Sequence, residues 1–187
     1  IPATRGDVFF EGANINALQA HQRISLGIAY TFQITSVFAG LSLHENVALA
    51  ARRRLGADVE AVNAKVADVL ARVGLVERTD QIAGDLSYGH QRLLEIAMGL
   101  AQDPRLFILD EPTQGLADSE VEEFIELINT LAGETTILLI EHNMDVVMKT
   151  ATHITVLDAG EVLAAGTPED IRANAAVQAA YLGTSDA

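Results

Sequence analysis

Two adjacent carboxylates follow an apolar segment beyond the middle of the chain. Residues 106–109 read Leu-Phe-Ile-Leu, and Asp110 and Glu111 come directly after them. Such a run is typical of a parallel strand covered on both faces, and open parallel sheets bind ligands beyond the carboxyl ends of their strands. One carboxylate could hold Mg²⁺ while the other accepts a proton from an attacking water. Acidic residues are also common where a strand meets an ordinary loop, so this segment alone leaves its role open.

A second candidate site lies at the start of an expected helix. Residues 86–91 read Leu-Ser-Tyr-Gly-His-Gln, and Ser87 is a good N-cap for a helix whose apolar stripe includes Leu93, Ile96 and Leu100. Free amides, a hydroxyl and a glycine at a helix start together suit an anion. Taken alone, an ordinary capped helix is the better explanation of this segment.

Two further polar residues follow other expected strands. Gln33 ends a strand expected from Leu26, and its amide could coordinate a metal or accept a bond from metal-bound water. His142 comes shortly after the apolar strand expected at residues 135–140, where a neutral imidazole could contact a phosphate or a water. Each residue type at such a position is more often incidental than functional.

The remaining pattern predicts strands that alternate with helices around a mostly helical insertion. Apolar residues recur at helical spacing from Val59 to Val73, and Gly74 stands where that helix should end. Ser119 and Glu122 are expected to form a capping box ahead of another helix. Further strands are expected at 6–12, 154–157 and 162–165, and further helices from Leu43, over 143–151 and from Thr167-Pro168.

The composition excludes several classes of function. The 187 residues include 12 Lys and Arg against 26 Asp and Glu, a net charge of −14. An acidic surface of this kind repels phosphate backbones, which argues against general nucleic-acid binding. With no cysteine, the chain has neither disulfides nor thiolate metal sites. Its apolar runs are too short to span a bilayer.

The order and spacing of these segments resemble the ABC ATPase family over nearly the whole chain. Gln33 resembles the glutamine of the family's Q-loop, and residues 86–91 resemble the signature motif. Residues 106–111 resemble Walker B with its catalytic glutamate, and His142 resembles the switch histidine. Four more residues resemble the D-loop: Gly115, Leu116, Ala117 and Asp118.

Finer details resemble one branch of that family, the importer ATPases for branched-chain amino acids. These details are Thr31-Phe32-Gln33, the Tyr-Gly variant of the signature, the segment 140–144 and the closing Ala180-Tyr181-Leu182-Gly183. Relatives within this branch also handle urea and short amides. The resemblance therefore implies import of branched-chain or similar amino acids.

The resemblance implies an α/β fold of the P-loop NTPase type, a mostly parallel sheet with a helical subdomain. Residues 1–37 and 101–187 would form the ATPase core, and residues 38–100 the helical subdomain. ATP and Mg²⁺ are the implied ligands. Glu111 and His142 would be catalytic, and Asp110 and Gln33 would serve Mg²⁺. Ser87, Gly89 and the helix N-terminus that follows would contact the γ-phosphate held by a second domain. The signature residues as a whole are Ser87, Tyr88, Gly89, His90 and Gln91.

The implied partners follow from how such ATPases assemble. A second ABC ATPase domain would pack head to tail against this one, as a homodimer or heterodimer, with Asp118 at the seam. The helical subdomain would dock on integral membrane permease subunits, which receive solute from a periplasmic or extracellular binding protein. No nucleic acid is expected. The protein would be peripheral, at the cytoplasmic face of the inner or plasma membrane.

One feature of the family is not found in the sequence. The phosphate loop, Gly-x-x-x-x-Gly-Lys-Ser/Thr, does not occur in the 187 residues. We expect an N-terminally truncated domain, because residues 1–12 resemble the segment that follows this loop in the family. Such a chain should expose apolar surface and an unpaired strand edge, and should bind ATP weakly or not at all.

Two alternatives to an importer subunit stay open. A soluble ABC ATPase of DNA repair or the ribosome is one, but long coiled-coil insertions and basic arms are lacking. The other is a non-hydrolytic interaction module that binds a partner through residues 38–100. The presence of Glu111 and His142 argues against this second alternative.

Overall fold

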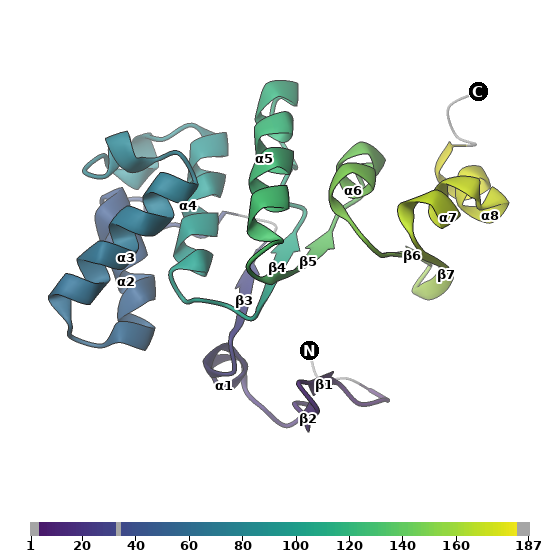
Figure 1. Ribbon diagram of the computed structural model, residues 1–187, viewed down its shortest axis with the longest axis horizontal. Helices are drawn as coiled ribbons and strands as arrows, with labels where there is room; N and C mark the ends of the chain where they lie inside the picture. Colours follow the sequence, from purple (N-terminus) through teal and green to yellow (C-terminus); the bar gives the residue numbers. More distant parts are fainter. Residues whose placement is uncertain (1–3, 33–34, 183–187) are drawn as a thin grey trace.

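A parallel sheet of three strands organises the chain, which the computed structural model describes over residues 4–32 and 35–182 (Figure 1). The strands are β3 (Ile28–Thr31), β4 (Leu106–Asp110) and β5 (Thr136–Ile140), with β4 between the other two. All three run in the same direction, so their carboxyl ends lie at one edge of the sheet. The expected Q-loop residue Gln33 lies outside the described residues.

Helices cover one face of this sheet and leave the other exposed. On the covered face Ala29, Phe107 and Leu109 are fully buried beneath α4 (Tyr88–Leu100) and α5 (Asp118–Leu131). Close packing of α4 needs Gly99, since a Cβ there would lie 2.3 Å from the Phe107 ring. On the opposite face large apolar side chains are exposed: Tyr30, Leu138 and Ile140. The apolar surface expected from the sequence is present on this face. Strand β4, expected to be covered on both faces, is only partly covered here, because Leu106 and Ile108 are half-buried.

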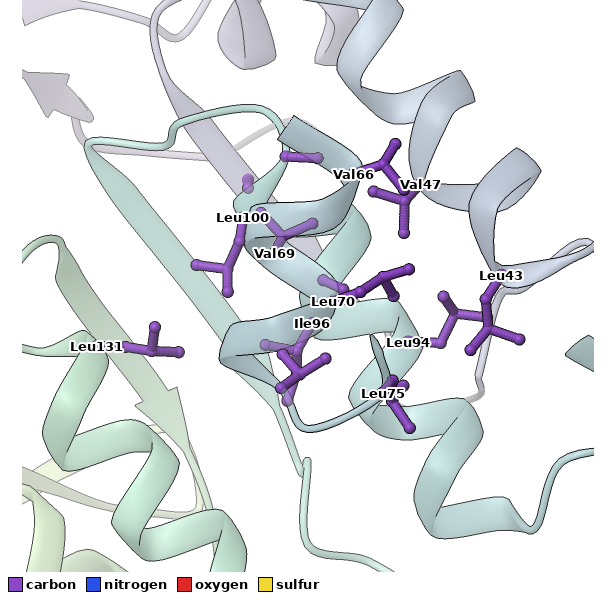
Figure 2. Packing of buried hydrophobic residues seen from close by; sticks show 14 of the residues in the cluster. Leu43, Val47, Val66, Val69, Leu70, Leu75, Leu94, Ile96, Leu100 and Leu131 are labelled. Carbon is purple, nitrogen blue, oxygen red and sulfur yellow. The ribbon is translucent and has the colours of Figure 1, made fainter. Parts of the chain in front are cut away.

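Three long helices pack together beside the sheet and share one apolar core with it (Figure 2). Helix α2 (Leu43–Leu55) begins at a capping box made by Ser42 and Glu45, and α3 (Val59–Arg72) begins at its N-cap Asp58. Gly74 has a φ of +72° and lies just past α3, as expected. The core between these helices and α4 is made of Leu, Ile, Val and Ala side chains, among them Leu43, Val47, Val66, Val69, Leu70, Leu75, Leu94 and Ile96.

Shorter elements extend the fold at both ends. A small hairpin of β1 (Phe9–Phe10) and β2 (Ala13–Asn14) precedes α1 (Ala20–Ser25). After the sheet come α6 (Met144–Thr150) and the hairpin of β6 (Ile154–Asp158) and β7 (Glu161–Gly166). The remaining helices are η1 (Val76–Arg78), η2 (Ala83–Asp85), α7 (Pro168–Ala173), α8 (Ala175–Val177) and the π-helical η3 (Gln178–Leu182). No helix among the described residues is long and apolar enough to cross a bilayer.

Three local expectations are wrong. The capping box at Ser119 and Glu122 does not form, because α5 begins earlier, where the Glu120 carboxylate accepts a bond from the Ala117 amide at 2.9 Å. The segment 6–12 is not one strand, since Glu11 and Gly12 both have positive φ and turn the chain into β2. Leu26 is the C-cap of α1, so the next strand starts later than expected.

We expect Gly99→Ala to destabilise the fold by up to about 2 kcal/mol, because the added methyl group overpacks the Phe107 ring at a cost of about 1 to 3 kcal/mol. This cost outweighs the gain in helix propensity, about 1 kcal/mol. Urea denaturation measures the free energy of unfolding. Gly133→Ala is the matched control, because its Cβ would meet nothing nearer than 3.6 Å. A Gly99→Ala protein as stable as the wild type would contradict this account of the packing.

Candidate active site

Asp110 is the last residue of the central strand and carries the first polar group of the site. Its Oδ2 accepts a hydrogen bond of 2.5 Å from the Tyr30 hydroxyl, which comes from the neighbouring strand β3. This bond is the main reason that the pKa of Tyr30 is raised, with burial and the charge of Asp110 adding to it. The contact fixes one oxygen of the Asp110 carboxylate at the edge of the sheet.

Glu111 leaves the strand at once, because its φ is +44°, in the left-handed region. Its amide donates to the Ile140 carbonyl at 2.8 Å, which ties the turn to strand β5. Glu111 Oε1 lies 3.7 Å from His142 Nδ1. The His142 side chain is 67% exposed and that of Glu111 27% exposed, so both groups can meet solvent or a ligand. The structure thus brings the Glu111 and His142 side chains together, directly after Asp110 at the end of β4.

Glu141 connects the loop after β4 with the loop after β5. Its Oε1 accepts bonds from the amide and the hydroxyl of Thr113, at 3.0 and 2.5 Å. Its Oε2 accepts from the amides of His142 and Asn143, at 3.2 and 3.4 Å. One carboxylate therefore holds both loops that carry the candidate catalytic residues. Sequence analysis did not single out Glu141, and its only local signal is its place directly before His142.

The expected signature residues open helix α4. Ser87 is its N-cap, and its hydroxyl lies 2.8 Å from His90 Nδ1 and accepts from the His90 amide at 3.3 Å. The Gln91 side chain instead donates to the carbonyls of Ala83 and Leu86, both at 3.3 Å. In this structure Gln91 therefore holds the preceding turn.

The expected D-loop residues lie against this helix start. A Cβ on Gly89 would lie 2.3 Å from Glu120 Oε1, and a Cβ on Gly115 would lie 3.3 Å from the Tyr88 ring. Leu116 precedes Ala117, the N-cap of α5, and Asp118 is the first residue of that helix. The signature residues and the D-loop residues thus form a second group, in contact with each other through Tyr88 and Gly115.

Helix α4 also contributes two charged residues that sequence analysis missed. The Arg92 and Glu95 side chains are 1% and 7% exposed, and Arg92 Nη1 lies 2.7 Å from Glu95 Oε2. Arg92 Nη2 donates to the Glu111 carbonyl at 3.1 Å. The signal in the sequence was a pair of opposite charges, three residues apart, within the apolar part of a helix.

The oxygen ligands at the edge of the sheet suit a cation that takes most of its ligands from water or from the substrate. The described residues contain no cluster of three His, Asp or Glu side chains able to hold a metal by themselves. Mg²⁺ commonly binds through one or two carboxylates together with waters and phosphate oxygens. The Asp110 carboxylate fits that mode of binding.

Comparison with known proteins decides the family. A model of the family described as ABC transporter matches residues 1–114. A second, described as Branched-chain amino acid ATP-binding cassette transporter, matches residues 161–187. The high-affinity branched-chain amino acid transport ATP-binding protein LivG of Escherichia coli is 37% identical over 96% of this chain and 77% of its own length. The chain belongs to the ABC transporter family.

Further relatives of this ABC chain support the same family and the same fold. BraF of Pseudomonas aeruginosa, a protein of the same description as LivG, is 38% identical over 96% of this chain and 77% of its own length. A solved nucleotide-free ATP-binding cassette from an ABC transporter has a TM-score of 0.81 at 25% identity, covering 95% of this chain and 77% of its own. Another solved ATP-binding cassette of an ABC transporter has a TM-score of 0.84 at 25% identity, covering 98% of this chain and 78% of its own. The predicted family and the predicted α/β fold are confirmed.

We expect Tyr30→Phe to lower the free energy of unfolding by about 0.5 kcal/mol, the low end for one hydrogen bond, because the side chain is partly exposed. The pKa of Tyr30 is raised in the folded state. Its stabilising bond is therefore fully present below about pH 10, the pKa in the unfolded chain, and is lost as the pH rises through the folded pKa. Urea denaturation of both proteins from pH 7 to 11 measures this difference. A difference that grew with pH would contradict it.

Proposed function

We propose that the chain is the ATP-binding and ATP-hydrolysing part of an ABC importer for branched-chain or similar amino acids. The observation that carries the proposal is the group of Asp110, Glu111 and His142 at the carboxyl edge of an ABC-family sheet. The solute is proposed from LivG and BraF, whose names describe branched-chain amino acid transport, at 37% and 38% identity.

In this proposal Glu111 is the general base. Its carboxylate accepts the proton of the water that attacks the γ-phosphate of ATP, and its exposure leaves room for that water. His142, 3.7 Å from Glu111, holds the γ-phosphate and the water in place. Catalysis of phosphoryl transfer consists mainly of such positioning and of electrostatic stabilisation.

Asp110 and Gln33 serve Mg²⁺ in this proposal. When bound, Mg²⁺ neutralises charge on the β- and γ-phosphate oxygens. Asp110 is suited to hold it directly or through water, because Tyr30 engages only Oδ2 of its carboxylate in the bond described above. Gln33 comes two residues after the end of β3 in the sequence and is assigned to Mg²⁺ on its resemblance to the Q-loop glutamine.

The signature and D-loop residues are proposed to act across a dimer. The N-terminus of α4, with Ser87, Tyr88, Gly89, His90 and Gln91, faces the γ-phosphate held by a second ABC ATPase domain packed head to tail. A helix of 13 residues offers unpaired amides at that end. Asp118 lies at the seam.

The helical part, residues 38–100, is proposed to dock on integral membrane permease subunits. This arrangement places the protein at the cytoplasmic face of the inner or plasma membrane, and a periplasmic or extracellular solute-binding protein acts through the permease. The acidic charge of −14 fits a role without nucleic acid.

The 187-residue chain alone is expected not to hold ATP tightly. No lysine follows a glycine in it, and its two lysines, Lys65 and Lys149, pair with Asp103 and Glu122. Titration calorimetry with MgATP should therefore give no measurable binding at micromolar concentrations. The same residues joined to an upstream phosphate-loop segment are the control and should bind. Micromolar affinity of the 187 residues alone would contradict the expectation.

Glu111→Gln in the full-length protein tests the assignment of the base. The amide cannot accept the proton, so hydrolysis should fall by about a hundredfold or more while ATP stays bound. Phosphate release measures turnover, and size-exclusion chromatography with MgATP should show an accumulated dimer. Glu126→Gln, on the exposed side of α5, is the matched control and should behave as wild type. Normal turnover in Glu111→Gln would rule out Glu111 as the base.

A further inference from the structure

Arg92 and Glu95 form a buried ion pair whose place in the molecule calls for a reason beyond stability. Their side chains are 1% and 7% exposed. Removing two charges from water costs about as much as their attraction returns, so well-packed apolar residues at such positions are often equally stable. The bonds that this pair makes to other parts of the chain supply the reason.

The Arg92 guanidinium donates to two backbone carbonyls that belong to different strand ends. Nη1 donates to the Phe32 carbonyl at 2.6 Å, just after strand β3. Nη2 donates to the Glu111 carbonyl at 3.1 Å, just after strand β4. The planar fork of arginine suits this double contact, since its donors diverge at fixed angles. Arg92 thereby holds the ends of two neighbouring strands on helix α4.

Glu95 completes the arrangement. Its Oε2 accepts a hydrogen bond from Arg92 Nη1 at 2.7 Å, and its Oε1 accepts one from the Ser36 amide at 3.3 Å. Phe32 and Ser36 are thus both bound by the same charged pair. Glu95 neutralises the guanidinium and orients it at the same time.

The contact with Glu111 bears on catalysis because that residue has an unusual backbone. Its φ is +44°, a conformation that costs a non-glycine residue about 1 kcal/mol or more. The peptide after Glu111 is fixed by Arg92 and by the Gln114 amide, which donates to the same carbonyl at 3.2 Å. Fixing this peptide fixes the direction of the Glu111 side chain toward His142.

We propose that Arg92, with Glu95 as its counter-ion, is a positioning residue for the hydrolytic step. It holds Glu111 in the orientation that activates water, and it attaches the ends of β3 and β4 to the helix that opens with the signature residues. This role rests on the proposed function, because it assumes that Glu111 is the base. Arg92 itself touches no substrate.

A pair of variants in the full-length protein separates positioning from stability. Arg92→Met leaves Glu95 buried without its partner and should lower both stability and kcat. Arg92→Met combined with Glu95→Leu removes the unpaired charge, so the midpoint of urea unfolding should return toward wild type. The kcat should stay about ten- to a hundredfold low, with KM for MgATP changed little, because misplaced groups slow the chemical step. Recovery of kcat together with stability would overturn the proposal.

A conservative variant and an exposed ion pair provide controls. Arg92→Lys keeps the charge beside Glu95 but loses the fork, so it should fold well and still have a reduced kcat. Full activity in Arg92→Lys would contradict the need for two carbonyl contacts. Lys149→Met combined with Glu122→Leu removes a surface pair of 2.6 Å and should leave kcat unchanged.

Amide hydrogen exchange without nucleotide tests the same idea independently of activity. In the double variant at positions 92 and 95, exchange should speed up at Ser36 and Gln114, whose amides donate to Glu95 and to the Glu111 carbonyl. The later turns of α4 should stay protected. Unchanged exchange at both amides would show that Arg92 does not hold these segments, even if Glu111→Gln had already ruled out the proposed base.

Discussion

The parallel register of β3, β4 and β5 is the constraint on which the rest of the structure depends. It pairs Asp110 with Ile140 and Thr31 with Leu109, so three strand ends meet at one edge. Residues 80 positions apart, Tyr30 and Asp110, come within hydrogen-bond distance for this reason. Parallel strands need long crossover connections, usually helices, and here α4 packs closely against Phe107 of the central strand.

Helix α4 serves the core and the site through different residues. Leu94, Ile96 and Leu100 enter the apolar core shared by the three long helices and the sheet. Arg92 and Glu95 are buried among them, and their charged groups form hydrogen bonds with backbone groups after β3 and β4. Since apolar packing holds the helix in place, it also holds the Arg92 and Glu95 side chains that contact the strand ends. The core thereby determines how firmly the strand ends are held.

Local signals predicted most of the fold, and long-range contacts account for what was missed. Periodicity, caps and short apolar runs were sufficient for α3, α6 and the two strands after α6, because those signals act within a few residues. Helix α1 went unpredicted because it has no buried residue and so no apolar stripe. In the site, the strand ends pointed to Asp110, Glu111 and His142. The roles of Tyr30, Arg92, Glu95 and Glu141 depend on partners far along the chain, which no local pattern reveals.

The backbone at Glu111 shows why such distant partners are needed. A positive φ is costly for this residue, and the following Pro112 restricts its conformation further. No neighbour in the sequence favours the strained form. It persists because the Glu111 amide is held by Ile140 and its carbonyl by Arg92 and Gln114. The local backbone preference of Glu111 is thus overridden, and its side chain leaves the strand and reaches His142. The contacts that compensate for the cost come from β5, from α4 and from the turn after Glu111.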